Sequence, residues 1–170
     1  MAYLKIREVG DPVLRTHCRP VDAITPRIKT LLDDMKDTLH RANGCGLAAP
    51  QVGILRRVVI IETEESGLIE LINPIITEKE GEQLETEGCL SIPGQWGITR
   101  RPAKVTVKAL DREGEMREYH GEGLLARALC HEIDHLDGKL YIDKGVFVRV
   151  VEDDELEEEE EEEDTDKDEK

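Results

Sequence analysis

Apolar positions recur with helical spacing along residues 25–42, TPRIKTLLDDMKDTLHRA. Five of them fall on one side of a helical wheel: Ile28, Leu31, Leu32, Met35 and Leu39. Thr25 stands at a capping position, and Pro26 suits the first helical residue because its fixed φ already matches a helix. The pattern predicts an amphipathic N-terminal helix.

Other stretches have the pattern of strands. Residues 57–62, RVVIIE, and residues 68–76, LIELINPII, are rich in aliphatic and β-branched side chains. Residues 104–120 alternate apolar and polar positions on both sides of a turn at Asp111–Gly114, which predicts a β-hairpin.

A second helix is predicted over residues 123–137, GLLARALCHEIDHLD, followed by Gly138, which can adopt the left-handed conformation at a helix end. This helix is apolar over much of its circumference, which indicates a central position wrapped by strands. We therefore expect an α+β fold with antiparallel sheets around a central helix.

The net charge of −16 is concentrated in residues 152–170, which contain 15 acids and 2 lysines. Such a run repels itself and cannot bury apolar surface, so we expect a disordered, solubilising acidic tail. Residues 1–151, with a net charge of only −3, are expected to form a single catalytic domain. No basic face suggests nucleic-acid binding.

The cellular location is predicted from membrane-spanning, targeting and cysteine patterns in the sequence. No apolar run approaches 18 residues, so we expect no membrane span. The first residues, MAYLKIREVG, resemble neither a secretory signal nor a transit peptide. The four cysteines show no disulfide-framework density, and in a reducing cytosol they are expected to be thiols or metal ligands.

The candidate chemistry begins with residues 130–138, CHEIDHLDG. On a helix, His131 and His135 share one face, with Cβ atoms about 5–6 Å apart. Two imidazoles so placed can bind one metal ion, with Glu132 near enough to move protons on a bound water. A catalytic site needs a third protein ligand.

Several residues are candidates for that ligand. His17, His40 and His120 lie beside no other site-like feature, and the acidic residues are too numerous to discriminate. Cys89 follows Gly88 in EGCLS, a segment that we interpret as too irregular for a simple strand. We favour Cys89, with the fourth position open to water as in catalytic sites.

Residues 44–51, GCGLAAPQ, combine glycines with small side chains and end on Gln51. Such a run permits close backbone approach to a ligand, and the Gln51 amide could donate to an oxyanion. Taken alone this signal is weak, because small-residue turns are usually only turns.

Together, GCGLAAPQ, EGCLS and HEIDH, in this order and at these separations, resemble the three signature motifs of the peptide deformylase family. Further similarities are GDPVLR at 10–15, the Asn73-Pro74 pair, SIPG at 91–94 and HLDGKL at 135–140. The resemblance covers residues 3–145, and the acidic tail lies outside it.

The resemblance implies a set of residue roles. The metal ligands would be Cys89, His131 and His135. Glu132 would be the general acid/base, and the Gln51 side chain and Leu90 backbone N–H would be the oxyanion donors. Gly46 and Gly88 would pair their backbone groups with the substrate peptide.

The resemblance also implies a reaction: hydrolysis of the N-formyl group from the initiator methionine of nascent peptides, with release of formate. The family uses Fe²⁺, which Zn²⁺, Ni²⁺ or Co²⁺ can replace. We accordingly expect a monomer in the bacterial cytoplasm that acts on chains leaving the ribosome and binds neither nucleic acid nor membrane.

Two positions depart from the family pattern. Cys130 replaces a glutamine before the first histidine, and we expect it to pack or to alter an outer hydrogen bond. Arg127 replaces an apolar residue near the methionine pocket, so we expect its stem along the pocket, its charge at the rim and an altered side-chain preference.

Three other residues have weaker signals. Cys45 is expected to line the site, Trp96 to border the cleft or pack, and Asp134 to support the centre from outside. Two alternatives remain: a zinc peptidase using the same helix motif, and a non-catalytic descendant that binds metal or peptide. Cys89 argues against the first, and retention of Glu132 and Gln51 argues against the second.

Overall fold

The computed structural model describes residues 2–150, so the predicted acidic tail lies outside the described residues. The described residues form two α-helices, α1 (Pro26–Ala42) and α2 (Gly123–Leu136). Three short 3₁₀ turns accompany them: Pro12–Arg15, Ala49–Val52 and Tyr141–Asp143. Among residues 2–150, no helix is long and apolar enough to cross a membrane.

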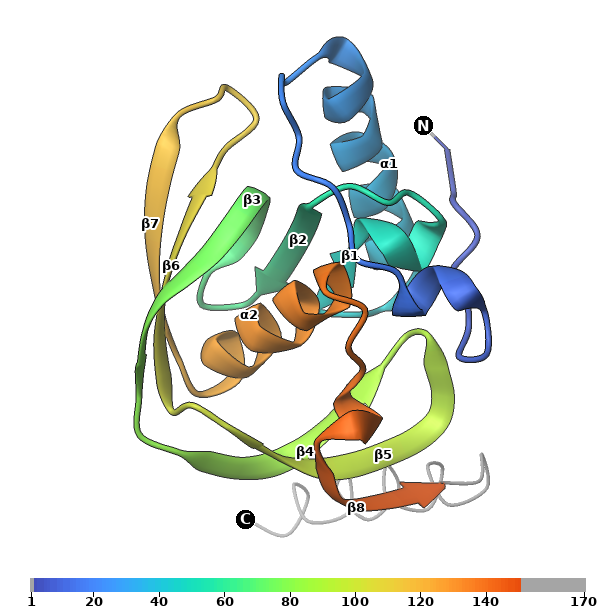
Figure 1. Ribbon diagram of the computed structural model, residues 1–170, viewed down its shortest axis with the longest axis vertical. Coiled ribbons are helices and arrows are strands. Elements are labelled where there is room, and N and C mark those ends of the chain that lie inside the picture. Colours follow the sequence, from blue (N-terminus) through green and yellow to red (C-terminus); the bar gives the residue numbers. More distant parts are fainter. Residues whose placement is uncertain (1, 151–170) are drawn as a thin grey trace, which may run out of the picture.

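The strands form two antiparallel sheets. The five-stranded sheet has the order β1-β2-β3-β6-β7: β1 (Gly46–Ala48), β2 (Val58–Thr63), β3 (Gly67–Glu80), β6 (Lys104–Leu110) and β7 (Met116–Glu122). The three-stranded sheet has the order β4-β5-β8: β4 (Gln83–Cys89), β5 (Ile92–Arg101) and β8 (Gly145–Val150). Helix α2 lies between the two sheets (Figure 1), so the predicted α+β class with antiparallel sheets is confirmed.

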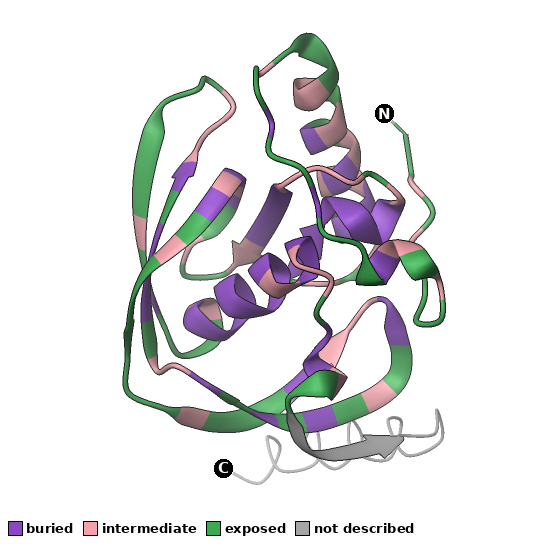
Figure 2. Cartoon of the chain, viewed as in Figure 1, coloured by how far each residue is buried: buried purple, intermediate pink, exposed green. Residues whose placement is uncertain are grey.

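Both predicted helices are confirmed. Helix α1 begins after Thr25, with Pro26 in its first turn, and it buries Leu32, Met35 and Leu39. Helix α2 ends just before Gly138, whose φ of 71° requires the left-handed conformation that glycine adopts without strain. From Ala126 onward α2 is buried except for the partly exposed Asp134 (Figure 2).

The strand predictions are confirmed in part. Strand β2 and the β6–β7 hairpin lie where expected, whereas β3 continues to Glu80, beyond its apolar part. The interpretation of the segment around Cys89 as too irregular for a strand is wrong, because Cys89 is the last residue of β4. A register shift between Glu87 and Cys89 is the irregular part. The pattern was missed because β4 turns a charged residue, Glu87, toward the interior.

The main core joins one side of α2 to the five-stranded sheet. Its buried residues include Ala126, Leu129, Ile133 and Leu136 from the helix, together with Val59, Ile61, Leu71, Val105 and Val107 from the sheet. Burial of this aliphatic surface fixes the helix against the sheet, at roughly 25 cal/mol per Å² of apolar area. The other side of α2 is thereby presented to β4 and β5.

Candidate metal centre and active site

Helix α2 and the end of β4 bring three possible metal ligands together. His131 and His135 lie one turn apart on α2, and their Nε2 atoms are 3.2 Å from each other. Cys89, 46 residues before His135, places its Sγ atom 3.4 Å from His135 Nε2. The candidate ligand atoms of Cys89, His131 and His135 all lie within 4.8 Å of one another.

These distances fit a tetrahedral metal ion. Ligands at about 2.0–2.1 Å for nitrogen and 2.3 Å for sulfur would be roughly 3.3–3.6 Å apart. Burial lowers the pKa of His135, which favours the neutral imidazole that a metal requires. Glu132 Oε2 is buried without a hydrogen-bond partner among the described residues, as expected if its partner is a ligand of the site.

Glu132 follows the first histidine and is 4% exposed. Its Oε1 atom is 3.9 Å from His131 Nε2, so the carboxyl group faces the same space as the three ligand atoms. Burial raises the pKa of Glu132 to about 7. A carboxyl group with a pKa near neutrality can both accept and return a proton under working conditions.

Beneath the ligands lies a buried polar cluster centred on Glu87. Glu87 Oε1 accepts from His131 Nδ1 at 2.5 Å and from Arg101 Nη2 at 2.6 Å, and Oε2 accepts from Arg127 Nη1 at 2.7 Å. Burial opposes ionisation, but hydrogen bonds from His131 and Arg101 hold the pKa of Glu87 below its usual value. Because its Nδ1 donates to Glu87, His131 directs Nε2 toward the other ligands.

The Gln51 amide is held beside Cys89. Its Oε1 accepts from the Ala48 N–H at 2.9 Å, which orients its Nε2 toward Ser91 Oγ at 3.0 Å and Cys89 Sγ at 3.6 Å. Gln51 is 1% exposed, so this orientation is fixed by packing. The structure therefore places a fixed amide donor at the edge of the candidate metal centre.

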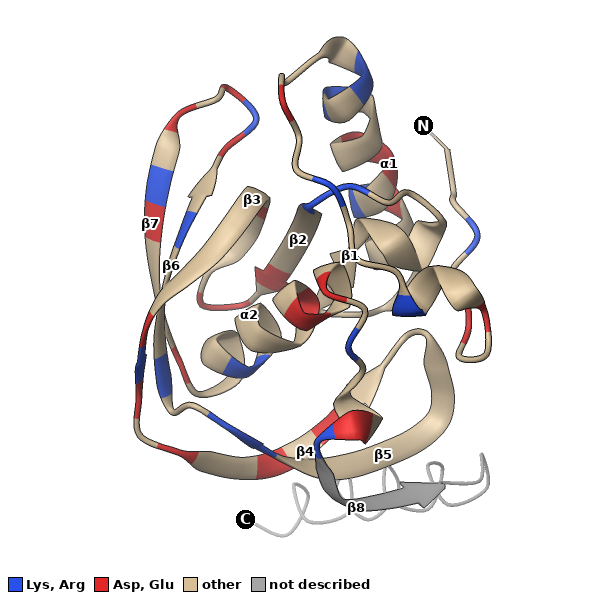
Figure 3. Cartoon of the chain, viewed as in Figure 1, with Lys and Arg blue, Asp and Glu red and all other residues tan. Residues whose placement is uncertain are grey.

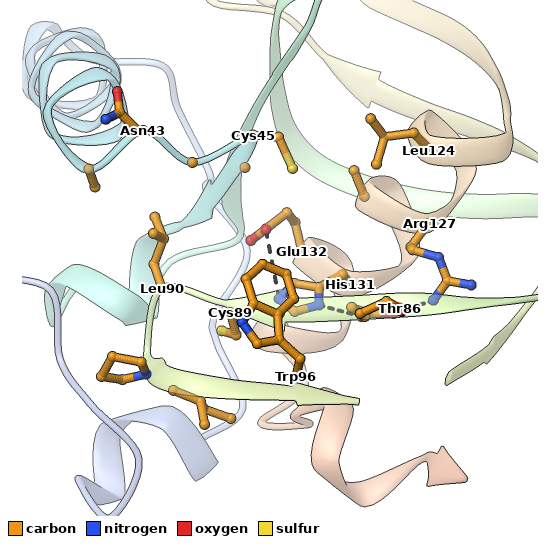
Figure 4. Close-up of a pocket in the computed structure, with 18 of the residues that line it drawn as sticks. Asn43, Cys45, Thr86, Cys89, Leu90, Trp96, Leu124, Arg127, His131 and Glu132 are labelled. Atoms are coloured by element: carbon orange, nitrogen blue, oxygen red, sulfur yellow. Dashed lines mark hydrogen bonds and ion pairs between the residues drawn. The ribbon is translucent and has the colours of Figure 1, made fainter. Parts of the chain in front are cut away.

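A cavity of about 530 Å³ opens onto these residues. Leu90, Trp96, Leu124 and Cys45 contribute to its walls, with His131 and Glu132 at its base (Figure 4). Its volume and largely apolar walls are those of a small-molecule or peptide side-chain site.

Two glycines keep this cavity open. A Cβ atom on Gly46 would lie 2.6 Å from Glu132 Oε1, and one on Gly88 would lie 2.7 Å from the Trp96 ring. Any side chain at Gly46 would displace the carboxyl group, and any at Gly88 would displace the indole. Glycine at these two positions therefore leaves room for the Glu132 carboxyl group and the Trp96 ring.

Comparison with known proteins decides the family. The sequence model of polypeptide deformylases matches residues 3–150. The chain is 59% identical to a peptide deformylase of Acetivibrio thermocellus, over 92% of this chain and 91% of the relative, and 57% identical to one of Caldanaerobacter subterraneus, over 92% and 97%. The chain belongs to the peptide deformylase family.

Solved deformylase structures have the same fold. The structure from Thermotoga maritima superimposes with a TM-score of 0.84 at 37% identity, covering 86% of this chain and all of that one. The structure from Legionella pneumophila gives a TM-score of 0.82 at 46% identity, covering 84% and 86%. The expected activity is confirmed: metal-dependent hydrolysis that removes N-formyl groups from nascent peptides. The zinc-peptidase alternative is wrong.

The predicted direction of the Arg127 side chain is wrong. Its charge was expected at the rim of the pocket, but the residue is 4% exposed and its guanidinium turns inward to Glu87 and the Thr99 carbonyl, at 2.7 and 3.2 Å. An unpaired carboxylate at Glu87 would be costly in this interior, and Arg127 helps to neutralise it. The side chain still contributes to the cavity wall.

The remaining candidate residues lie outside the group of candidate ligand atoms. Cys130 is buried in the apolar core and is not among the grouped ligand atoms, and Asp134 pairs with Arg101 at 2.6 Å and Lys144 at 3.1 Å. The other three histidines lie outside the centre and face carboxylates: His17 with Asp137, His40 with Glu62 and His120 with Glu118. Trp96 is 42% exposed at the cavity.

Sequence reasoning missed the cluster around Glu87. Glu87 stands inside EGCLS, next to the proposed ligand Cys89, and a charged residue within a metal motif was the available signal. Arg101 and Thr99 carried no signal, because only the fold of β5 brings them beneath α2.

Proposed function

We propose that Cys89, His131 and His135 hold the catalytic metal and that Glu132 is the general acid/base of deformylation. The convergence of these four side chains on one buried space carries this proposal. We further propose Fe²⁺ as the working metal, replaceable by Zn²⁺, Ni²⁺ or Co²⁺. A thiolate and two imidazoles suit these borderline metals rather than Mg²⁺ or Ca²⁺.

When bound, the metal would lower the pKa of a water and polarise the formyl carbonyl. Glu132 takes a proton from the attacking water and returns it to the departing amine. The fixed Gln51 Nε2 and the Leu90 N–H donate to the formyl oxygen as negative charge develops on it. Donors fixed by packing need no reorganisation, so they stabilise the transition state more than the substrate.

The substrate is an N-formylmethionyl peptide. Its backbone lies along Gly46 and Gly88, two positions without a side chain that line the cavity. Its first side chain enters the cavity lined by Cys45, Leu124 and the stem of Arg127. Because the Arg127 charge is neutralised by Glu87, we expect methionine to remain preferred when formyl-Met, formyl-Leu and formyl-Glu peptides are compared.

Residues 1–151 act as one catalytic domain, and the bacterial relatives support a bacterial cytoplasmic setting. The expected partner is the nascent chain as it leaves the ribosome, with the enzyme acting as a monomer. Light scattering during turnover tests the last point: a monomer mass with full activity supports it, and activity confined to a dimer contradicts it.

The deciding experiment measures formate release from a formyl-Met tripeptide by protein prepared anaerobically with Fe²⁺. Glu132→Gln should lose about 10²- to 10⁴-fold in kcat while its metal content stays the same. Glu62→Gln, which changes a surface glutamate, is the matched control and should keep full activity. Undiminished turnover in Glu132→Gln would overturn the role of Glu132.

A further inference from the structure

A second cavity, of about 510 Å³, lies away from the candidate metal centre. It is formed by the segment before α1, the first turn of α1 and the segment that leads into β2. Three arginines line it, Arg19, Arg27 and Arg56, with a single acid, Asp22. Basic residues mark the start of α1 and the entry to β2 in Figure 3.

These arginines differ from the others that the structure describes. Eight arginines have a carboxylate within 4.0 Å: Arg7, Arg15, Arg57, Arg100, Arg101, Arg112, Arg117 and Arg127. Arg41 lies over the Tyr3 ring, 4.4 Å from its centroid. Among the arginines whose side chains the structure describes, the three cavity arginines have neither a carboxylate within 4.0 Å nor a ring partner among the described residues.

The backbone holds two of these charges side by side. Arg19 and Arg56 face each other in a parallel β-bridge, in which the Arg57 N–H donates to the Arg19 carbonyl at 3.0 Å. Like charges so placed repel each other, and Asp22 is the single acid that lines the cavity. The other arginines whose side chains are described have a partner, whereas these three have no carboxylate partner among the described residues and are open to an external anion.

We propose that this cavity binds a small diphosphate ester. Three guanidinium groups and one carboxylate leave two positive charges to neutralise, and the planar guanidinium fork matches phosphate oxygens. The volume lies within the range of small-molecule sites. Val21 and Ile28 supply an apolar wall for the uncharged part of the ester. This site is separate from deformylation, so its test does not depend on activity.

The test is isothermal titration calorimetry of the full chain in phosphate-free buffer. Inorganic pyrophosphate and ADP should bind saturably with one site per chain, while sodium chloride at equal ionic strength gives no saturable heat. Arg19→Gln, Arg27→Gln and Arg56→Gln should each weaken binding about tenfold. Arg100→Gln, at an exposed arginine already paired with Glu82, is the matched control and should bind as the wild type does.

Unchanged melting temperatures without ligand establish that the variants are folded. Binding that survives all three substitutions, or that Arg100→Gln weakens equally, would overturn the proposal.

Two further experiments test other occupants of the cavity. If a short RNA without terminal phosphates binds in an arginine-dependent way, and neither pyrophosphate nor ADP binds, the proposal is overturned in favour of an RNA ligand. Diphosphate binding that appears only after Glu157–Glu163 are changed to glutamine would mean that the acidic segment occupies the cavity instead.

Discussion

Helix α2 is buried on two sides that differ completely in chemistry. Toward the five-stranded sheet it presents Ala126, Leu129 and Ile133, which pack against aliphatic side chains. Toward β4 and β5 it presents Arg127 and His131, which contact the buried carboxylate of Glu87. The exposed fractions are similar, from 0% to 7%, so burial alone does not distinguish the two sides.

The difference lies in what each side requires. The apolar side needs only matching volume, because dispersion and the hydrophobic effect are not directional. The charged side needs a partner for every group, since an isolated buried charge costs several kcal/mol. Loss of one residue should therefore leave a cavity on the first side but an uncompensated charge on the second.

The largest effect is expected for Glu87→Gln. It leaves Arg101 and Arg127 buried without their shared carboxylate, which should lower the free energy of unfolding by about 3–5 kcal/mol in urea denaturation. It also replaces the charged acceptor of His131 Nδ1 with a neutral amide oxygen, which weakens the hydrogen bond that orients this imidazole, so metal should be released to a chelator faster. Glu85→Gln, an exposed position on the same strand, should change neither quantity. Equal metal retention in both variants would contradict the orienting role.

Leu129→Ala tests the opposite side of the helix. Leu129 is 0% exposed, so its truncation should cost about 2–5 kcal/mol in the same denaturation experiment. Metal release from the folded protein should stay at the wild-type rate, because none of the ligands or their partners is altered. If Leu129→Ala also loses metal readily, the two sides of α2 are not independent.

Arg127→Met should have a smaller effect, about 1–3 kcal/mol, because it removes one charge-assisted contact but leaves Arg101 on Glu87. Metal release should increase less than in Glu87→Gln. The free energy of unfolding and the rate of metal loss to a chelator measure both points. A loss as large as that of Glu87→Gln would mean that Arg127, and not Arg101, chiefly neutralises the carboxylate.

The smallest effect is expected for a surface pair, Arg15–Asp143, at 2.6 Å with both side chains partly exposed. The hydrogen bond from Arg15 lowers the pKa of Asp143, so its stabilising contribution is present above the ordinary carboxyl pKa of 3.8 and is lost as pH falls through the lowered value. Asp143→Asn should therefore be less stable than wild type by at most about 1 kcal/mol at pH 7. The difference should vanish in strong acid; a constant difference would exclude the charge as its cause.

Local periodicity was enough to predict both helices, β2 and the β6–β7 hairpin. Each is specified by contacts between residues a few positions apart, and the helix start at Pro26 or chain reversal at Gly138 needs no distant partner. The spacing of His131 and His135 likewise placed both imidazoles on one face, as the structure shows. The local sequence thus contained the shape of these elements and two of the three candidate metal ligands.

Only the tertiary structure decided the rest, since the partners are distant in sequence. Cys89 meets His135 across 46 residues, and Glu87 meets Arg127 across 40. The Arg127 guanidinium turns inward because the Glu87 carboxylate is buried beside it. Sequence periodicity does not reveal that burial, so the guanidinium was predicted at the rim of the pocket. Strands β4 and β5 escaped prediction for the same reason: their inward positions include Glu87, Thr99 and Arg101, whose burial depends on pairing with one another.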